Sequence, residues 1–86
     1  MIKTAVVILN WNGRAFLEKF LPGVIACTTS PETQVMVADN GSDDDSVRWL
    51  SANHPDIRVI QLDRNYGFAG GYNRAIDKIE AEYYIL

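Results

Sequence analysis

Cysteine and long apolar runs are nearly absent from this 86-residue chain. Cys27 is the only cysteine, which excludes an internal disulfide and any zinc site built from cysteines. The apolar run 5–9 is far too short to cross a bilayer, which takes about 20 residues. The start of the chain also lacks the apolar region and cleavage site of a signal peptide. We therefore expect a soluble segment located in the reducing cytoplasm.

An excess of positive charge is also missing. Eight basic and eleven acidic residues give a formal net charge of −3, so we expect no nucleic-acid partner. Hydrophobic residues make up 48% of the chain and charged residues 22%, which is typical of a globular protein rather than a disordered one. A chain of this length has room for one small domain with a single core.

Short apolar runs alternate with amphipathic stretches, and no repeat or linker interrupts them. The runs predict strands at 4–10, 34–40 and 57–62, with a fourth strand opening at 83–86. The amphipathic stretches between them predict helices at about 13–27, after residue 42 and after residue 67. This order implies right-handed crossovers. We expect an α/β fold with a Rossmann-like parallel sheet and flanking helices, truncated at the fourth strand.

The expected helices carry cap signals and apolar faces. Asn12 is placed to cap the first helix with its side-chain oxygen, and Ser42 with Asp45 has the spacing of a capping box for the second. The expected inward residues of the first helix are Phe16, Leu17, Phe20, Leu21, Val24 and Ile25. Those of the third helix are Phe68, Tyr72, Ala75, Ile76 and Ile79.

Polar residues cluster where the first three strands end. The clusters are Asn10 and Asn12, then Asp39 and Asn40, then Arg64, Asn65 and Gly67. Parallel sheets of this kind bind ligands beyond the carboxyl ends of their strands. We therefore expect a ligand site where the three clusters converge.

Asp39 is the strongest candidate for a ligand contact. Its carboxylate can accept a hydrogen bond from a base imide or from ribose hydroxyls. The alternative is that Asp39 caps the following turn, but residues 40–42 already supply turn and cap chemistry, so the ligand role is favoured. For Asn10 and Asn12 the ligand role and a tight turn around Gly13 are evenly balanced.

Glycines are concentrated at the start of the third helix, at Gly67, Gly70 and Gly71. Glycine in a helix costs up to about 1 kcal/mol relative to alanine. We expect close backbone approach here, by a ligand or by the neighbouring strand. Arg64 either offers its guanidinium to a base, ribose or phosphate, or is an exposed charge paired with Asp63 or another acid.

Three further polar and aromatic positions bear on the site. Asn73 lies on the flank of the third helix near Gly70, where its amide can bond a ligand or the loop after the first strand. Trp11 and Trp49 are expected to be packing residues rather than stacking platforms. His54 is expected to be an exposed loop residue and is assigned no chemistry.

Three stretches of the sequence resemble family 2 glycosyltransferases. They are AVVILNWNG at 5–13, VMVADNGSDDDS at 35–46 and NYGFAGGYNRAI at 65–76. They occur in the family's order and cover nearly the whole chain. The first and third look most like the branch that includes bacterial rhamnosyltransferases of cell-surface polysaccharides.

The resemblance implies that residues 1–86 are the nucleotide-sugar-binding part of a GT-A fold, in an incomplete domain. It implies an inverting transfer of a sugar from a nucleotide diphosphate donor to a polysaccharide or glycolipid acceptor. By the same resemblance Asp39 contacts the base and the first loop holds base and ribose. The implied donor-nucleotide residues are Asn10, Asn12, Asp39, Asn40, Arg64, Asn65, Gly67 and Asn73.

The family's metal-binding Asp-x-Asp motif follows the fourth strand, whereas this sequence ends at Leu86. A divalent cation, Mg²⁺ or Mn²⁺, is expected for the complete enzyme, with no ligands in this chain. The run 43–45 has the same spacing but belongs to a helix start and is assigned no metal. No catalytic residue is assigned either, and we expect no sugar transfer by this chain alone. The full-length protein is expected in the cytoplasm, at the inner face of the membrane if its missing part anchors it there.

Other classes fit parts of the pattern. A dinucleotide-binding oxidoreductase also has an acid after its second strand, but the first loop 10–13 lacks the Gly-x-Gly-x-x-Gly fingerprint. A nucleotidyltransferase has a similar sheet. A non-enzymatic interaction module would bind no nucleotide, and a partner would cover its open sheet edge. That open edge also predicts self-association.

Overall fold

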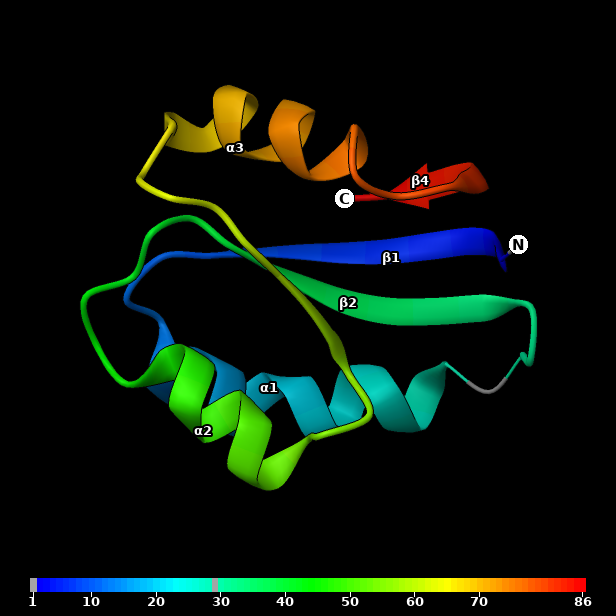
Figure 1. Ribbon diagram of the computed structural model, residues 1–86. Helices are drawn as coiled ribbons and strands as arrows, with labels where there is room; N and C mark the ends of the chain where they lie inside the picture. Colours follow the sequence, from blue (N-terminus) through cyan, green and yellow to red (C-terminus); the bar gives the residue numbers. More distant parts are fainter. Residues whose placement is uncertain (1, 29) are drawn as a thin grey trace.

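The computed structural model describes residues 2–28 and 30–86 and contains a four-stranded parallel sheet with helices on both faces (Figure 1). The elements in chain order are β1 (Ile2–Asn10), α1 (Arg14–Cys27), β2 (Thr33–Asp39), α2 (Ser46–Asn53), β3 (Arg58–Gln61), α3 (Gly67–Ile76) and β4 (Ala81–Ile85). Helices α1 and α2 lie on one side of the sheet and α3 lies on the other (Figure 1). The expected α/β fold with a Rossmann-like sheet is confirmed.

The strands are ordered β3-β2-β1-β4, and the carboxyl ends of β1, β2 and β3 are aligned with one another. Asn10 at the end of β1 is in register with Asp39 of β2, and Asp39 is in register with Gln61 of β3. The last residue of β4, Ile85, pairs with Val6 near the middle of β1. The polar residues that follow β1, β2 and β3 therefore share one edge.

The core is divided into two layers by the sheet. Met36 and Ala38 of β2 face α3, whereas Val35 and Val37 pack with α1 and α2. All four side chains are buried, which explains the unbroken apolar run of this strand. Leu21 of α1 is only 1% exposed, and burying such a side chain contributes roughly 1.5–3 kcal/mol.

Three aromatic residues do not lie where their spacing predicted. Phe16, Phe20 and Phe68 are 71%, 52% and 75% exposed. Helix α1 turns the narrow stripe of Leu17 and Leu21 toward the sheet, and the two phenylalanines stack on each other outside it with ring centroids 5.7 Å apart.

Several element boundaries also differ from expectation; β1, for example, begins at Ile2 rather than at residue 4. Ile79 is buried as predicted, but it lies in the turn after α3, which ends at Ile76. The fourth strand begins at Ala81 rather than Tyr83. Among residues 2–28 and 30–86, no helix combines the length and apolar character needed to cross a bilayer.

Candidate functional site

The edge where β1, β2 and β3 end contains three polar residues that are almost fully buried. Asn10, Asp39 and Asn40 are 4%, 3% and 2% exposed. A buried polar group without a partner is costly, so such residues need hydrogen bonds. The structure supplies them from the loops at the same edge, whose residues come from widely separated parts of the sequence.

The Asp39 carboxylate accepts three hydrogen bonds from the chain. Its Oδ1 accepts from Asn10 Nδ2 at 3.0 Å and from Ser42 Oγ at 2.7 Å. Its Oδ2 accepts from the Ser42 backbone N–H at 3.0 Å. Asp39 therefore caps the turn after β2, the role that sequence reasoning ranked second. Its contact with a ligand stays a prediction.

Ser42 joins this turn to the loop after β1. Its Oγ accepts from the Asn12 N–H at 2.9 Å and from Asn10 Nδ2 at 3.3 Å, while its hydroxyl donates to Asp39. We call Asn10, Asn12, Asp39 and Ser42 the Ser42 network. It fixes two loops that are about 30 residues apart in the chain.

Asn12 does not cap α1 as predicted. Its φ of 51° is in the left-handed region, and its Oδ1 accepts from the N–H groups of Asp43 and Asp44, at 2.7 and 3.1 Å. The N–H of Arg14 at the start of α1 instead donates to Asp44 Oδ2 at 3.2 Å. A carboxylate from the second loop thus takes the capping role, because Asn12 is committed to that loop's backbone.

The predicted capping box of α2 is also wrong. Asp45 is the N-cap residue and makes no side-chain cap bond, and Ser42 is engaged with Asp39. Asp44 Oδ1 accepts instead from the Ser46 N–H and hydroxyl. Desolvation acts to raise the pKa of Asp44, but the hydrogen bonds from Ser46 and Arg14 outweigh it and lower the pKa below its usual value.

Asn40 ties the end of β2 to the start of α3. Its Nδ2 donates to the Gly67 carbonyl at 3.0 Å and to Asn65 Oδ1 at 3.2 Å. Its Oδ1 accepts from the Tyr66 N–H at 3.0 Å. Asn65 Oδ1 also accepts from the Gly67 N–H at 2.7 Å. These residues, expected at the donor nucleotide, therefore hold the third loop in place.

The expected close approach at the glycine-rich start of α3 is present, and its partner is the sheet. A Cβ on Gly71 would lie 2.8 Å from Asn40 Nδ2 and 3.0 Å from Leu9 Cδ1. Gly41 has a φ of +74°, and a Cβ there would lie 2.6 Å from the Arg64 backbone. Both glycines let the loops and α3 close onto the strand ends.

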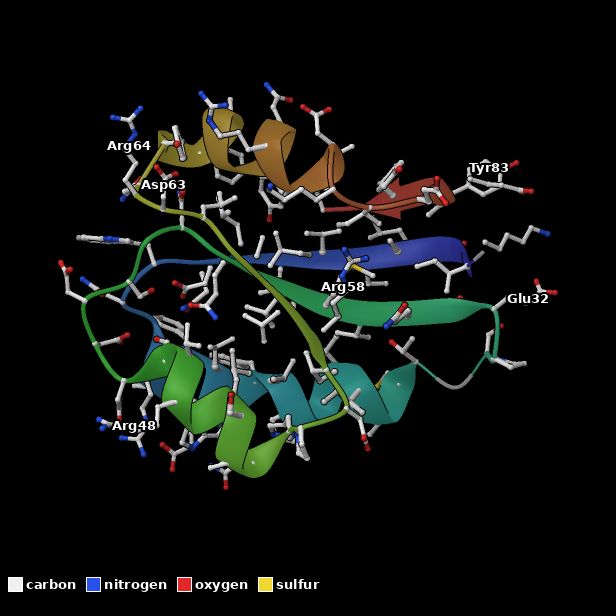
Figure 2. The ribbon with its side chains drawn as sticks, viewed as in Figure 1. Glu32, Arg48, Arg58, Asp63, Arg64 and Tyr83 are labelled. Carbon is white, nitrogen blue, oxygen red and sulfur yellow. The ribbon has the colours of Figure 1, made fainter. Side chains whose placement is uncertain are left out.

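Arg64 points away from the sheet on the loop before α3, next to Asp63 (Figure 2). Its guanidinium lies 5.0 Å from the centroid of the Tyr66 ring, and that of Arg74 lies 3.9 Å from it. The Tyr66 hydroxyl donates to Asp63 and lowers the pKa of that carboxyl. Tyr66 and the Asp63 charge in turn raise the pKa of Arg64.

Four of the predicted site residues are exposed, although Asn12 and Asn65 already use their side-chain oxygens within the chain. Asn12, Arg64, Asn65 and Asn73 are exposed. Trp11, expected to pack, is 51% exposed and directly follows β1. The sequence signal for this exposure was the position of Trp11 between two asparagines in a polar loop after a strand.

Trp49 lies in α2, and His54 follows the last residue of that helix. Trp49 is partly buried and packs on the α1–α2 layer, as predicted. Its ring centroid is 5.3 Å from that of His54, which lies just after α2 as a loop residue, as predicted, but is partly buried rather than exposed.

Metal ligands do not converge in the described part of the chain. Among residues 2–28 and 30–86, no group of three or more His, Cys, Asp or Glu side chains is placed to hold an ion. Asp44 in the acidic run is already bonded to Arg14 and Ser46. These residues therefore do not fit a complete divalent-cation site.

The strand order and the polar strand-end loops define an α/β domain of the GT-A class. The same fold occurs in a mannosyltransferase from Pyrobaculum calidifontis, solved in complex with GDP-Man and Mn²⁺. That structure matches with a TM-score of 0.71 and 22% identity, over 91% of this chain and 24% of the other.

The chain belongs to glycosyl transferase family 2, whose family model matches residues 5–86. Similar proteins include N-acetylglucosaminyl-diphospho-decaprenol L-rhamnosyltransferases from two strains of Mycobacterium tuberculosis. Each is 30% identical over 74 residues, which is 86% of this chain. The chain spans 24% of the length of these relatives.

Proposed function

We propose that residues 1–86 form the donor-nucleotide-binding part of an inverting glycosyltransferase. The complete enzyme would transfer a sugar from a nucleotide diphosphate to a polysaccharide or lipid-linked acceptor in cell-surface glycan synthesis. The observation that carries this proposal is the edge itself. Three strand ends lie in register, and the loops that follow them are fixed by buried hydrogen bonds, with an aromatic ring and a cation exposed beside them.

Trp11 supplies a stacking surface for the base. The hydrogen bonds of Asn10 and Asn12 on either side fix its backbone, so little order is lost when a ligand binds. Stacking of a base on an aromatic side chain contributes about 1–3 kcal/mol. Asp39, at the end of the adjacent strand, would accept a hydrogen bond from the edge of the stacked base.

Arg64 and Asn73 complete the proposed nucleoside pocket. Both side chains are exposed on the third loop and α3. The guanidinium of Arg64 keeps its charge at any physiological pH and can bond a ribose or phosphate oxygen. Asn40, Asn65 and Gly67 would act indirectly, because their hydrogen bonds fix the loop that carries Arg64.

The rest of the reaction needs groups that residues 2–28 and 30–86 do not bring together. A Mg²⁺ or Mn²⁺ ion would neutralise the diphosphate leaving group, and a carboxylate would deprotonate the acceptor hydroxyl. Both belong to the complete enzyme, so we expect no turnover by the chain alone. A lipid-linked acceptor would place the complete enzyme at the cytoplasmic face of a membrane.

Titration with UDP, dTDP, GDP and NAD, followed by calorimetry, tests the proposal. We expect a nucleoside diphosphate to bind and the affinity to fall in Asp39→Ala and Trp11→Ala. Trp49→Phe removes the other tryptophan, on the α1–α2 layer, and should leave the affinity unchanged. Binding of NAD alone would favour an oxidoreductase. Silence toward every nucleotide would favour an interaction module.

We also propose that a second copy of the chain covers the open edge of the sheet. Strand β4 is an edge strand, with Tyr83 and Ile85 61% and 55% exposed. A second exposed apolar surface, apart from the β4 residues, is the groove of about 300 Å³ between α1 and β1 that Phe16 and Phe20 line. Edge strands with exposed apolar residues pair readily with one another. Sedimentation at rising concentration should show a dimer, and a monomer throughout would contradict this.

A further inference from the structure

Asp63 and Arg64 are neighbours of opposite charge in the chain, yet they do not form an ion pair. Among residues 2–28 and 30–86, the two ion pairs present both involve Arg14. The Asp63 carboxylate instead accepts a hydrogen bond from the Tyr66 hydroxyl. The Arg64 side chain is exposed and points away from the sheet (Figure 2), so its guanidinium stays accessible.

Tyr66 is held in place by contacts that do not involve Asp63. Its backbone N–H donates to the buried Asn40 side chain at 3.0 Å, and its partly buried ring packs against the core layer under α3. The guanidinium of Arg74, from α3, lies 3.9 Å from the centroid of the ring. These contacts fix the direction of the ring, and with it the position of the hydroxyl beside Asp63.

The charges around Asp63 make this hydrogen bond consequential. The bond from Tyr66 lowers the pKa of Asp63, and the nearby charges of Arg64 and Arg74 lower it further. The carboxylate is therefore ionised at neutral pH, and without the hydroxyl it is free to turn to Arg64. A guanidinium that pairs with a carboxylate through both oxygens uses two of its five N–H donors, whereas one held near a ring keeps them.

We propose that Tyr66 is a positioning residue that holds the Asp63 carboxylate away from Arg64 and so keeps the guanidinium available to the donor nucleotide. The inference rests on the proposed function, in which Arg64 bonds a ribose or phosphate oxygen. Tyr66 needs no contact with the ligand. When its hydroxyl is missing, the ligand has to displace Asp63 from Arg64 before it binds. An exposed pair of this kind weakens binding by roughly twofold to fivefold.

Calorimetry tests this with whichever of UDP, dTDP and GDP binds the parent chain most tightly. Tyr66→Phe keeps the ring and removes the hydroxyl, and the affinity should fall roughly twofold to fivefold. In a chain that already carries Asp63→Asn, the competing charge is absent, so adding Tyr66→Phe should have no further effect. It should also have no effect in an Arg64→Ala chain, which has lost the group that Tyr66 keeps available.

Tyr84→Phe is the matched control. It also removes a hydrogen-bonded hydroxyl from a partly buried tyrosine, which donates to the Ile79 carbonyl at 2.7 Å. Its affinity for the nucleotide should equal that of the parent chain. Urea denaturation of every variant shows that the chain is folded, and a purely structural role of the Tyr66 hydroxyl would lower affinity whether or not residue 63 is charged.

Unchanged affinity in Tyr66→Phe would overturn the inference, and so would an equal loss in the chains with and without Asp63→Asn. Tighter binding by Tyr66→Phe would also overturn it, because the hydroxyl would then hinder Arg64. If none of the three nucleotides binds the parent chain, the proposed function fails and this inference fails with it. If the parent chain and Tyr66→Phe bind equally, only this inference fails.

Discussion

The strand-end edge and the β4 edge of the same sheet differ in the polarity and burial of their side chains. At the ends of β1, β2 and β3, Asn10, Asp39 and Asn40 are buried and every one is bonded within the chain. Along β4, Tyr83 and Ile85 are exposed, and within residues 2–28 and 30–86 the strand has β1 as its single neighbour in the sheet. Polar groups are thus satisfied where a small ligand is expected, and apolar groups are left uncovered where a protein surface is expected. Substitutions at the two edges should accordingly change different properties.

The largest effect is expected when the Ser42 network loses its acceptor. Asp39→Ala removes the acceptor of three hydrogen bonds from the buried Asn10 and the partly buried Ser42, so the free energy of unfolding should fall by about 3 kcal/mol. Urea denaturation measures the change. Asp43→Ala, at an exposed carboxylate of the same loop, is the control and should cost less than about 0.5 kcal/mol. Similar losses in both variants would mean that the network contributes little to stability.

The close contact between α3 and the strand ends should produce the next largest effect. Gly71→Ala places a Cβ 2.8 Å from Asn40 Nδ2 and should destabilise the fold by roughly 1–3 kcal/mol. Gly23→Ala is a matched control in α1, where nothing lies within 4 Å of the added Cβ. That substitution should stabilise the chain by about 0.5–1 kcal/mol. Thermal unfolding of the two variants should therefore shift in opposite directions.

Trp11 should separate ligand binding from stability. Its side chain is half exposed, so Trp11→Ala should change the free energy of unfolding by less than about 0.5 kcal/mol. Loss of base stacking should weaken nucleotide binding roughly tenfold. Calorimetry and urea denaturation on one preparation measure both quantities. Unaltered affinity would remove Trp11 from the proposed pocket.

The apolar groove between α1 and β1 should show the reverse pattern. Phe16→Ser together with Phe20→Ser removes two exposed rings from the apolar groove, with little loss of stability. The double variant should sediment as a monomer at concentrations where the parent chain forms dimers. It should bind nucleotide as the parent does. Unchanged dimerisation would exclude this groove from the contact.

The smallest effect is expected on the pH dependence of the free energy of unfolding, when Asp44 is replaced. The pKa of Asp44 is lowered in the folded chain, so its contribution to stability is present above the unfolded pKa and disappears as pH falls through the folded pKa. Asp44→Asn should make the loss of stability between neutral pH and about pH 3 less steep. Because Asp44 is exposed, the change should be slight. Denaturation curves of both chains across this range provide the measurement.

The regular elements were predictable because their signals are local. The apolar run 35–38 is buried on both faces of the sheet, and this alone predicts a central parallel strand. Alternation of strands with helices then dictates parallel pairing with right-handed crossovers. Helix α1 was placed correctly, but its inward stripe is narrower than its apolar residues suggested, since Phe16 and Phe20 remain outside.

The partners of the polar side chains were not predictable from local spacing. Asn12 has the spacing of a helix cap, yet it bonds the backbone of residues 43 and 44. Asp39 was expected to reach a ligand, and three donors from the chain already contact it. A motif states which donors and acceptors are present but not which of them meet.

By itself, the sequence determined the fold class, the family and the clustering of polar residues at the ends of three strands. Periodicity and turn chemistry act over a few residues, so they can be read along the chain. Only the tertiary structure decided which of those polar residues are buried and bonded and which face solvent. The reason is that Asn10 meets Ser42, and Asn40 meets Gly67, only after the parallel strands have aligned their ends.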